Sequence, residues 1–272
     1  MIRDLYMGVD QQQMNEQRDL LVRVMQGYDI DVTDETATRL LGYLDLMLKK
    51  NNEMNLTAIR DFNKGVILHI VDSLLYYKSI MKFASLADLY YPTADEVAEV
   101  EEDSVISFLD MGCGAGLPGI PLTIIEPSLH GVLCDSTKKK IAVVQSMVED
   151  LDLSGQLTTC AERVEQLPMR FVDGFSVVTA RAMGTLPVLL EYASPLLFED
   201  GIFVVSKGNP PADEMKSASK VAHLVGMELL DSTEYQLPGD MGHRVILTYG
   251  KVDEPRVELP RPVGMASSHP LA

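Results

Sequence analysis

An acid and three glycines stand close together in the middle of the chain, and this grouping could bind a nucleotide-like ligand. Asp110 follows a short apolar run that predicts a buried strand, and Gly112, Gly114 and Gly116 lead into a helix that begins near Pro118. Glycines at such a place let the backbone turn sharply and bring N–H groups close to a ligand. A carboxylate beside them would repel a pyrophosphate but attract a cationic amino group. The grouping therefore favours S-adenosylmethionine over a dinucleotide.

The same glycines leave a dinucleotide site open as an alternative. Residues 114–119 fit the pattern G-x-G-x-x-G, although Pro118 and Pro121 crowd the first turn, where the third glycine of a dinucleotide site allows close packing. Asp135 ends a second expected strand, 19 residues after the last of the three glycines. That distance suits a carboxylate that binds a ribose in either class of site. Asp110 is what separates the two classes, and it favours S-adenosylmethionine.

Composition and charge restrict the function further. The chain has 272 residues, of which 46% are hydrophobic and 23% charged, as in an ordinary globular protein. It shows no apolar run of 18 residues, no signal peptide, and three cysteines without a C-x-x-C pair. We therefore expect a cytoplasmic protein that uses no membrane and no metal. We also expect a monomer, because no apolar helix face is left over after core packing.

The net charge of −17 argues mildly against nucleic acid, because proteins that bind it usually carry a basic face. Part of the excess is local, since residues 88–104 hold seven acids and no Lys or Arg. We interpret this segment as a solvated linker or insertion. If RNA is the substrate, the basic residues that remain must be well placed.

The pattern along the chain divides it into four segments. Residues 1–87 predict a helical region, 88–104 the acidic linker, 105–250 a methyltransferase domain and 251–272 an extended tail. The expected strands are 105–109, 131–134, 157–160, 176–179, 202–206, 227–235 and 244–249. The expected helices of the same domain are 117–125, 138–151, 186–198 and 212–225. Such alternation predicts an α/β fold with a parallel sheet, closed here by a late antiparallel hairpin. Class I S-adenosylmethionine-dependent methyltransferases, which have a Rossmann-like seven-stranded sheet, share that hairpin.

Candidate site residues stand where the expected strands end, because open parallel sheets bind ligands at the carboxyl ends of their strands. Arg181 follows the fourth strand and Lys207 ends the fifth, near the place of a methyl acceptor, with a surface salt bridge as the alternative for each. Glu165 follows the third strand, where the adenine of a bound S-adenosylmethionine is expected. His69 and Asp72 share one face of an expected helix, where a structural role is the alternative.

Residues 110–122 resemble the signature of the bacterial small-subunit rRNA guanine-N7 methyltransferases, also called glucose-inhibited division protein B. Other blocks of the chain agree with the same family. They are Asn55-Leu-Thr57 with Arg60-Asp61, His69 to Leu74, Asp135-Ser136 with Lys139-Lys140, Arg181-Ala182, Lys207-Gly208 and the ending from Pro260. The resemblance spans roughly residues 30–272. It departs at Lys50, where the family often has Trp, at Leu68, where it often has Arg or Lys, and in a tail that lacks the usual lysines.

This resemblance implies an enzyme that uses S-adenosylmethionine to methylate N7 of one guanine in 16S rRNA, within the small ribosomal subunit. It also implies a class I fold with an N-terminal helical extension. The residues expected to bind the cofactor are Asp110, Gly112, Gly114, Leu117, Asp135, Val164, Glu165 and Arg181. Arg181 and Lys207 are expected to contact the RNA, and no general base is expected. A methyltransferase for a small molecule or a protein stays an alternative, and a dinucleotide-binding module a weaker one.

Overall fold

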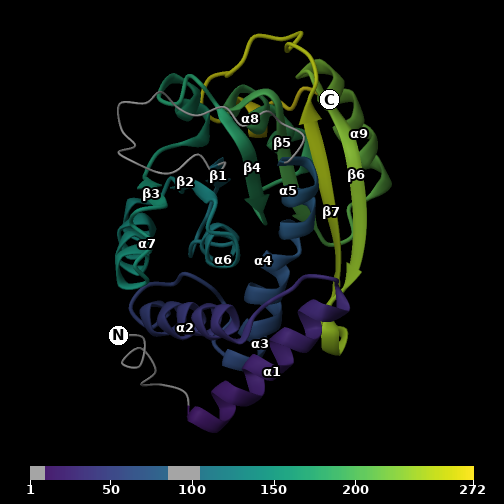
Figure 1. The fold of residues 1–272 in the computed structure, drawn as a ribbon. Helices are drawn as coiled ribbons and strands as arrows, with labels where there is room; N and C mark the ends of the chain where they lie inside the picture. Colours follow the sequence, from purple (N-terminus) through teal and green to yellow (C-terminus); the bar gives the residue numbers. More distant parts are fainter. Residues whose placement is uncertain (1–9, 85–104) are drawn as a thin grey trace.

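The structure, a computed structural model, describes residues 10–84 and 105–272, so the expected acidic linker lies outside the described residues. A seven-stranded sheet forms the centre of the molecule, and helices cover it (Figure 1). The strands are β1 (Ile106–Met111), β2 (Leu129–Cys134), β3 (Leu157–Cys160), β4 (Phe175–Arg181), β5 (Leu197–Lys207), β6 (Met227–Gln236) and β7 (His243–Lys251). The α-helices are α1 (Gln11–Gly27), α2 (Asp34–Asn51), α3 (Phe62–Gly65), α4 (Asp72–Leu74), α5 (Tyr76–Ala84), α6 (Gly119–Ile125), α7 (Lys138–Asp150), α8 (Leu186–Ala193), α9 (Ala212–Leu224) and α10 (Met265–Ser268).

The order of the strands in the sheet is β3-β2-β1-β4-β5-β7-β6. Strands β1 to β5 pair in parallel, and β7 pairs antiparallel with both β5 and β6. The chain order reverses between β1 and β4, which places a crevice at the carboxyl ends of these two strands. The expected closing hairpin is therefore confirmed, with β7 inserted beside β5. A doubly wound dinucleotide fold would continue with further βα units instead.

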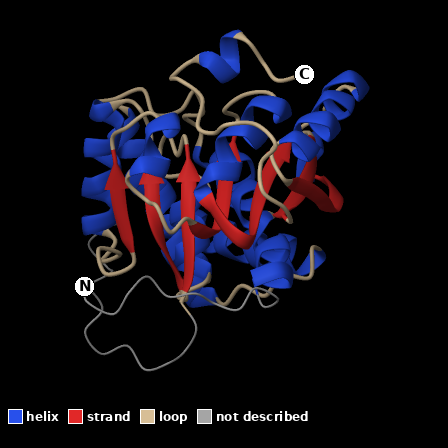
Figure 2. Cartoon of the chain, turned by 90° about the horizontal axis from the view of Figure 1, so that it is seen from above, coloured by secondary structure: helices blue, strands red, loops and turns tan. Residues whose placement is uncertain are grey.

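Neighbouring residues of the central strands point to opposite faces of the sheet, and each face has its own core. Phe108 and Val177 join the core that includes the N-terminal helices, whereas Leu109 and Val178 join the core under α8 and α9. Figure 2 shows helices on both faces of the sheet. The N-terminal helical region thus packs directly on the sheet, and α2 and α4 contact α6, the helix after the glycine loop (Figure 1).

One expected helix was too long. The pattern predicted a helix over 186–198, but α8 ends at Ala193, a single 3₁₀ turn follows, and β5 already begins at Leu197. Pro195 explains the difference, because proline has no N–H to continue the helical ladder. Leu197 instead pairs with Phe175 of β4. The continuous apolar pattern could not distinguish the buried end of a helix from the buried start of a strand.

Two buried tyrosines connect the N-terminal helices to the carboxyl edge of the sheet. Tyr43 of α2 donates a hydrogen bond to the carbonyl of Ala115 in the glycine loop, at 2.8 Å. Tyr76 of α5 donates to the carbonyl of Ala180 at 2.8 Å and accepts from the N–H of Ser206 at 3.0 Å. The Tyr76 hydroxyl therefore bridges β4 and β5 where their ends meet the site.

We expect Tyr76→Phe to lower the free energy of unfolding by about 1–3 kcal/mol, because it leaves a buried N–H and a buried carbonyl without this partner. Tyr28→Phe is the matched control, since the half-buried Tyr28 hydroxyl makes one hydrogen bond, to the carbonyl of Gln236 at 2.7 Å. Chemical denaturation of both variants measures the difference. Equal stability of the two would contradict a structural role for the Tyr76 bridge.

Candidate functional site

The glycine loop takes the shape that its residues predict. Gly112, Gly114 and Gly116 have φ values of 65°, 57° and 91°, in the left-handed region that favours glycine. A Cβ at Gly114 would meet only the carbonyl of Gly112, at 4.0 Å, and would project into open space. A side chain there would fill room that a ligand needs, so the loop forms a cradle.

Asp110 lies beneath this loop rather than in the cavity, contrary to the expectation that it meets an amino group. Strand β1 runs one residue past Asp110, whose side chain is fully buried. Its carboxyl group accepts hydrogen bonds from the N–H of Gly119 at 2.9 Å and the hydroxyl of Thr179 at 3.1 Å. Burial raises the pKa of Asp110 to about 7, although both hydrogen bonds oppose that shift. Asp110 thus connects β1, β4 and the start of α6.

Gly119 allows α6 to pack closely against the sheet, as the third glycine of a dinucleotide site does. A Cβ on Gly119 would overlap Leu133 of β2 and would stand 3.0 Å from a carboxyl oxygen of Asp110. Helix α6 therefore approaches the sheet at its first residue, and the neighbouring prolines do not prevent it. The third glycine of the pattern does not distinguish the two classes of site here.

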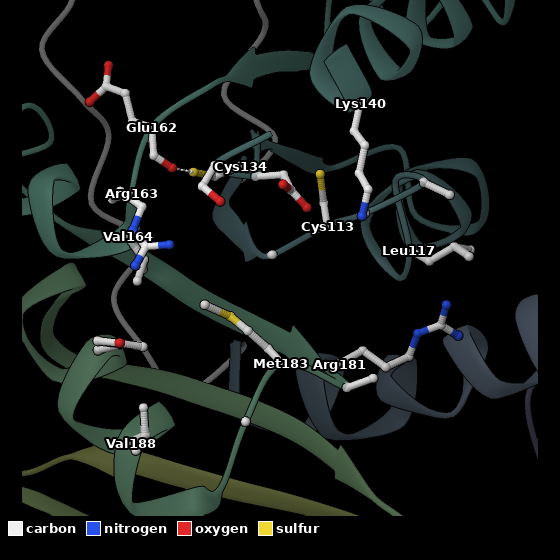
Figure 3. Close-up of a pocket in the computed structure, with 18 of the residues that line it drawn as sticks. Cys113, Leu117, Cys134, Lys140, Glu162, Arg163, Val164, Arg181, Met183 and Val188 are labelled. Atoms are coloured by element: carbon white, nitrogen blue, oxygen red, sulfur yellow. Dashed lines mark hydrogen bonds between the residues drawn. The ribbon is translucent and has the colours of Figure 1, made fainter. Parts of the chain in front are cut away.

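A cavity of about 770 Å³ opens above the loop, at the carboxyl ends of the central strands. This volume is typical of a site for a cofactor-sized molecule. Seven of the eight expected cofactor-binding residues line it: Gly112, Gly114, Leu117, Asp135, Val164, Glu165 and Arg181. Figure 3 shows Val164 and Leu117 on opposite sides of the space, with Met183 between them. The structure therefore brings together the glycine loop and the ends of β2, β3 and β4.

Asp135 lies at the start of the loop before α7 and at the edge of the cavity. One of its carboxylate oxygens accepts from the N–H of Thr137 at 2.8 Å, at the start of α7, and the residue lines the cavity. Lys140 was missed as a site residue, although the sequence motif included it. Its side chain extends from α7 toward Cys113 and Leu117 (Figure 3). With Arg163 and Arg181, it adds positive charge to a cavity that also contains the carboxylates of Asp135, Glu162 and Glu165.

The C-terminal tail contributes to the same cavity, although it was expected to be merely extended. The N–H of Gly264 donates to the carboxylate of Glu165 at 2.8 Å, and Ser267 and Pro270 line the cavity. Arg261 fixes the tail through a two-pronged ion pair with Glu191 of α8. The proline-rich composition of the tail gave no signal for this contact.

A second cavity of about 370 Å³ adjoins the first, at the ends of β4 and β5. Arg181 lines both, and its guanidinium donates a hydrogen bond to the carboxylate of Asp72. The Asp72 carboxylate is buried between two guanidinium groups, 3.3 Å from Arg181 and 2.8 Å from Arg244. Arg244, on β7, was not predicted, because its partner lies 172 positions away in the sequence.

Lys207 lines the second cavity, but its ammonium is already engaged. It stands 2.8 Å from a carboxylate oxygen of Glu214 and donates to the carbonyl of Gly184 at 2.9 Å. The same Glu214 oxygen accepts from the N–H of Leu186. Lys207 therefore holds the loop after β4 against α9, and the salt-bridge alternative describes it better than an RNA contact.

The sequence is similar to those of known proteins. The model of the family described as rRNA small subunit methyltransferase G matches residues 93–238, more than half of the chain. The chain belongs to this family. A relative of that name from Carboxydothermus hydrogenoformans is 33% identical over 246 residues, which cover 90% of this chain and 95% of the relative. The family member from Acetivibrio thermocellus is 29% identical over 255 residues, 93% and 96% of the two chains.

The family assignment agrees with the fold of solved structures. Magnesium protoporphyrin IX methyltransferase from Synechocystis, solved with bound S-adenosylmethionine, aligns with a TM-score of 0.51 over 77% of this chain and 97% of its own. At 13% identity this likeness shows the class I methyltransferase fold alone. Within residues 10–84 and 105–272 no helix is long and apolar enough to cross a bilayer. The same residues contain no group of three or more His, Cys, Asp or Glu placed to hold a metal ion.

Proposed function

We propose that this protein transfers a methyl group from S-adenosylmethionine to N7 of one guanine in the 16S rRNA of the small ribosomal subunit, as a cytoplasmic monomer. The observation that carries the proposal is a cofactor-sized cavity above a glycine cradle, in a chain whose relatives are named rRNA small subunit methyltransferases. The net charge of −17 argues mildly against an RNA substrate, but the cavity itself contains basic side chains. Lys140 and Arg181 line the cavity.

The residues of the cavity suit an adenosyl amino acid. The cradle at Gly114 leaves room for the ligand, Asp135 lies where a ribose-binding carboxylate is expected, and Val164 supplies an apolar wall for an adenine. When bound, the cofactor supplies a methyl group on a positively charged sulfur. We assign Asp110 to positioning, because it sets the loop and α6 without reaching the cavity.

The chemistry asks little of the protein beyond alignment. The N7 lone pair of guanine lies in the ring plane and carries no proton, so no base has to remove one before attack. Positive charge then develops on the purine, which disfavours a cation pressed against the ring. The Arg181 guanidinium is held beside Asp72 instead, at 3.3 Å. The protein accelerates the reaction by orienting the base and excluding water. A guanine in folded RNA must be splayed out to enter such a site.

The test is transfer of labelled methyl to 30S subunits from a strain that lacks the native enzyme, followed by identification of the modified base. We expect one 7-methylguanine per subunit, and much weaker labelling of protein-free 16S rRNA, because recognition of RNA depends strongly on shape. Label in a small molecule or a ribosomal protein, with none in rRNA, would favour the alternative acceptors. Tight NAD binding with indifference to adenosylhomocysteine would favour a dinucleotide module.

A further inference from the structure

The last part of the C-terminal tail forms a strap, residues 260–270, that is anchored on both sides. Leu259 before it and Leu271 after it pack against the core under α8 and α9. Within the strap, Ala266 of α10 is buried, and α10 contacts α8 (Figure 1, where the tail is yellow). Chain ends are usually poorly ordered unless such contacts tie them down. The strap is therefore a fixed part of the molecule, although it stands at the end of the sequence.

One guanidinium group closes this strap. Arg261 donates two hydrogen bonds to the carboxylate of Glu191 on α8, and only 4% of the Glu191 side chain is exposed. The same guanidinium donates to the carbonyl of His269, near the other end of the strap, at 3.0 Å. A two-pronged pair with a carboxylate is specific in geometry as well as strong. Arg261 thus ties both ends of the strap to α8.

The middle of the strap holds the carboxylate of Glu165, an expected cofactor-binding residue. Oε1 of Glu165 accepts from the N–H of Gly264 at 2.8 Å and from the hydroxyl of Tyr192 at 3.3 Å. Tyr192 follows Glu191 on α8, and its hydroxyl lies 3.3 Å from that of Ser267 in the strap. Both donors meet the same oxygen, so the strap and α8 together set the direction of the Glu165 side chain.

The other oxygen of Glu165, Oε2, makes no hydrogen bond in the part of the chain that the structure describes, and it lies 4.0 Å from Nε of Arg163. Glu165 lines the cofactor cavity, as do Ser267 and Pro270 of the strap. A carboxylate oxygen at this place can accept from the hydroxyl or amino groups of an adenosyl ligand. Arg163 lines the cavity too and competes for the same oxygen, because a small shift would complete the ion pair.

We propose that the strap is a positioning element of the cofactor site, which directs the Glu165 carboxylate toward the adenosyl end of S-adenosylmethionine. Its residues Ser267 and Pro270 close that end of the cavity. This inference rests on the proposed function and deepens it. Arg261 and Gly264 act through Glu165 and do not have to touch the ligand. Without their hold, the Glu165 carboxylate turns toward Arg163 and away from the cofactor.

The first test is the affinity for adenosylhomocysteine, measured by calorimetry on the full chain. We expect Arg261→Ala to weaken it about tenfold, because small misplacements in an active site are costly. Arg256→Ala is the matched control. Arg256 belongs to the same tail, but it contacts His223 and Asp253 and lines a separate cavity beside α9 and β6. We expect this control to change the affinity by less than about twofold.

Gly264→Ala is a milder variant, because Arg261→Ala leaves the buried Glu191 without its partner. A Cβ at Gly264 would meet nothing within 4 Å, but the φ of 81° is unfavourable for alanine. The turn shifts, and with it the N–H that Glu165 accepts, so we expect the affinity to fall about threefold to tenfold. Gly239→Ala brings similar strain, at a φ of 65°, to an exposed turn before β7. It should change the affinity by less than about twofold.

Two readouts distinguish positioning from mere support of the fold. In Arg261→Ala the KM for S-adenosylmethionine should rise about tenfold, while kcat at saturating cofactor changes less than about threefold, because the lost interaction binds ground state and transition state alike. A protein that is simply less folded loses kcat and keeps its KM. In addition, Glu165→Gln and Arg261→Ala should weaken adenosylhomocysteine binding less than additively when combined, because both act on one contact.

Unchanged affinity in Gly264→Ala, or full additivity of Arg261→Ala with Glu165→Gln, would overturn this inference alone. A wild-type protein that binds adenosylhomocysteine but methylates no 30S subunit would overturn the proposed acceptor, while the affinities of the variants still decide the role of the strap. A wild-type protein that does not bind adenosylhomocysteine would overturn the proposed function and the inference together.

Discussion

Asp72→Asn is expected to lower the free energy of unfolding by about 3 kcal/mol, because it leaves two guanidinium groups without their shared counter-ion. Only 7% of the Asp72 side chain is exposed, and the side chains of Arg181 and Arg244 are 14% and 21% exposed. Removing one member of a buried ion pair costs far more than removing an exposed one, since the remaining charge stays poorly hydrated. Urea denaturation of wild type and variant measures the difference.

Asp29→Asn is the matched control for this prediction. Asp29 is exposed and pairs with Lys78 at 3.3 Å, and its φ of 54° is one that asparagine accepts readily. We expect a loss below about 1 kcal/mol, as is usual for surface ion pairs. If both variants lose the same stability, the network around Asp72 does not act as a buried ion pair.

Asp72→Asn should also reduce methyl transfer, because Asp72 holds Arg181 in the wall between the cavities. We expect kcat/KM on 30S subunits to fall about tenfold or more, since small misplacements in an active site are costly. Adenosylhomocysteine affinity should change much less. A fall in activity that merely follows the fraction of unfolded protein would argue against a positioning role for Asp72.

The sequence predicted the fold well, since its information is local. Apolar runs that alternate with helical patterns predicted all seven strands of the sheet. Local residue types also explain helix ends, as at Thr33, whose hydroxyl caps α2 by accepting from the N–H of Thr36 at 3.1 Å. The boundaries were less certain, because hydrophobicity alone does not distinguish a buried strand from a buried helix end. Pro195 was the local signal that would have shortened the expected helix over 186–198.

The site was predictable only in part, for the same reason. Residues such as Gly112 and Asp135 could be found because they stand at the ends of expected strands. Contacts between distant segments were invisible, as with Arg244 and Asp72 or Gly264 and Glu165. Asp110 shows a further limit. The pattern placed it at the right point in the chain, but the direction of its side chain depends on how far β1 continues.

Gly119→Ala is the second substitution with a large expected effect, although alanine is normally the better residue in a helix. Its methyl group would overlap Leu133, which is fully buried, and crowd Asp110, whose carboxyl group accepts from the N–H of residue 119 itself. Overpacking of a core costs about 1–3 kcal/mol, and it would push α6 and the glycine cradle away from the sheet. We therefore expect lower stability together with an adenosylhomocysteine affinity reduced about tenfold or more.

Gly27→Ala gives the comparison that isolates the cause of this effect. Gly27 is the last residue of α1, and a Cβ there would meet nothing within 4 Å. We expect this variant to be neutral or up to about 1 kcal/mol more stable, as helix propensity dictates. Opposite signs for the same change at the two positions would assign the loss at Gly119 to the contact between α6 and the sheet. Unchanged cofactor affinity in Gly119→Ala would mean that the cradle keeps its shape without that contact, and that Asp110 supports the fold rather than the site.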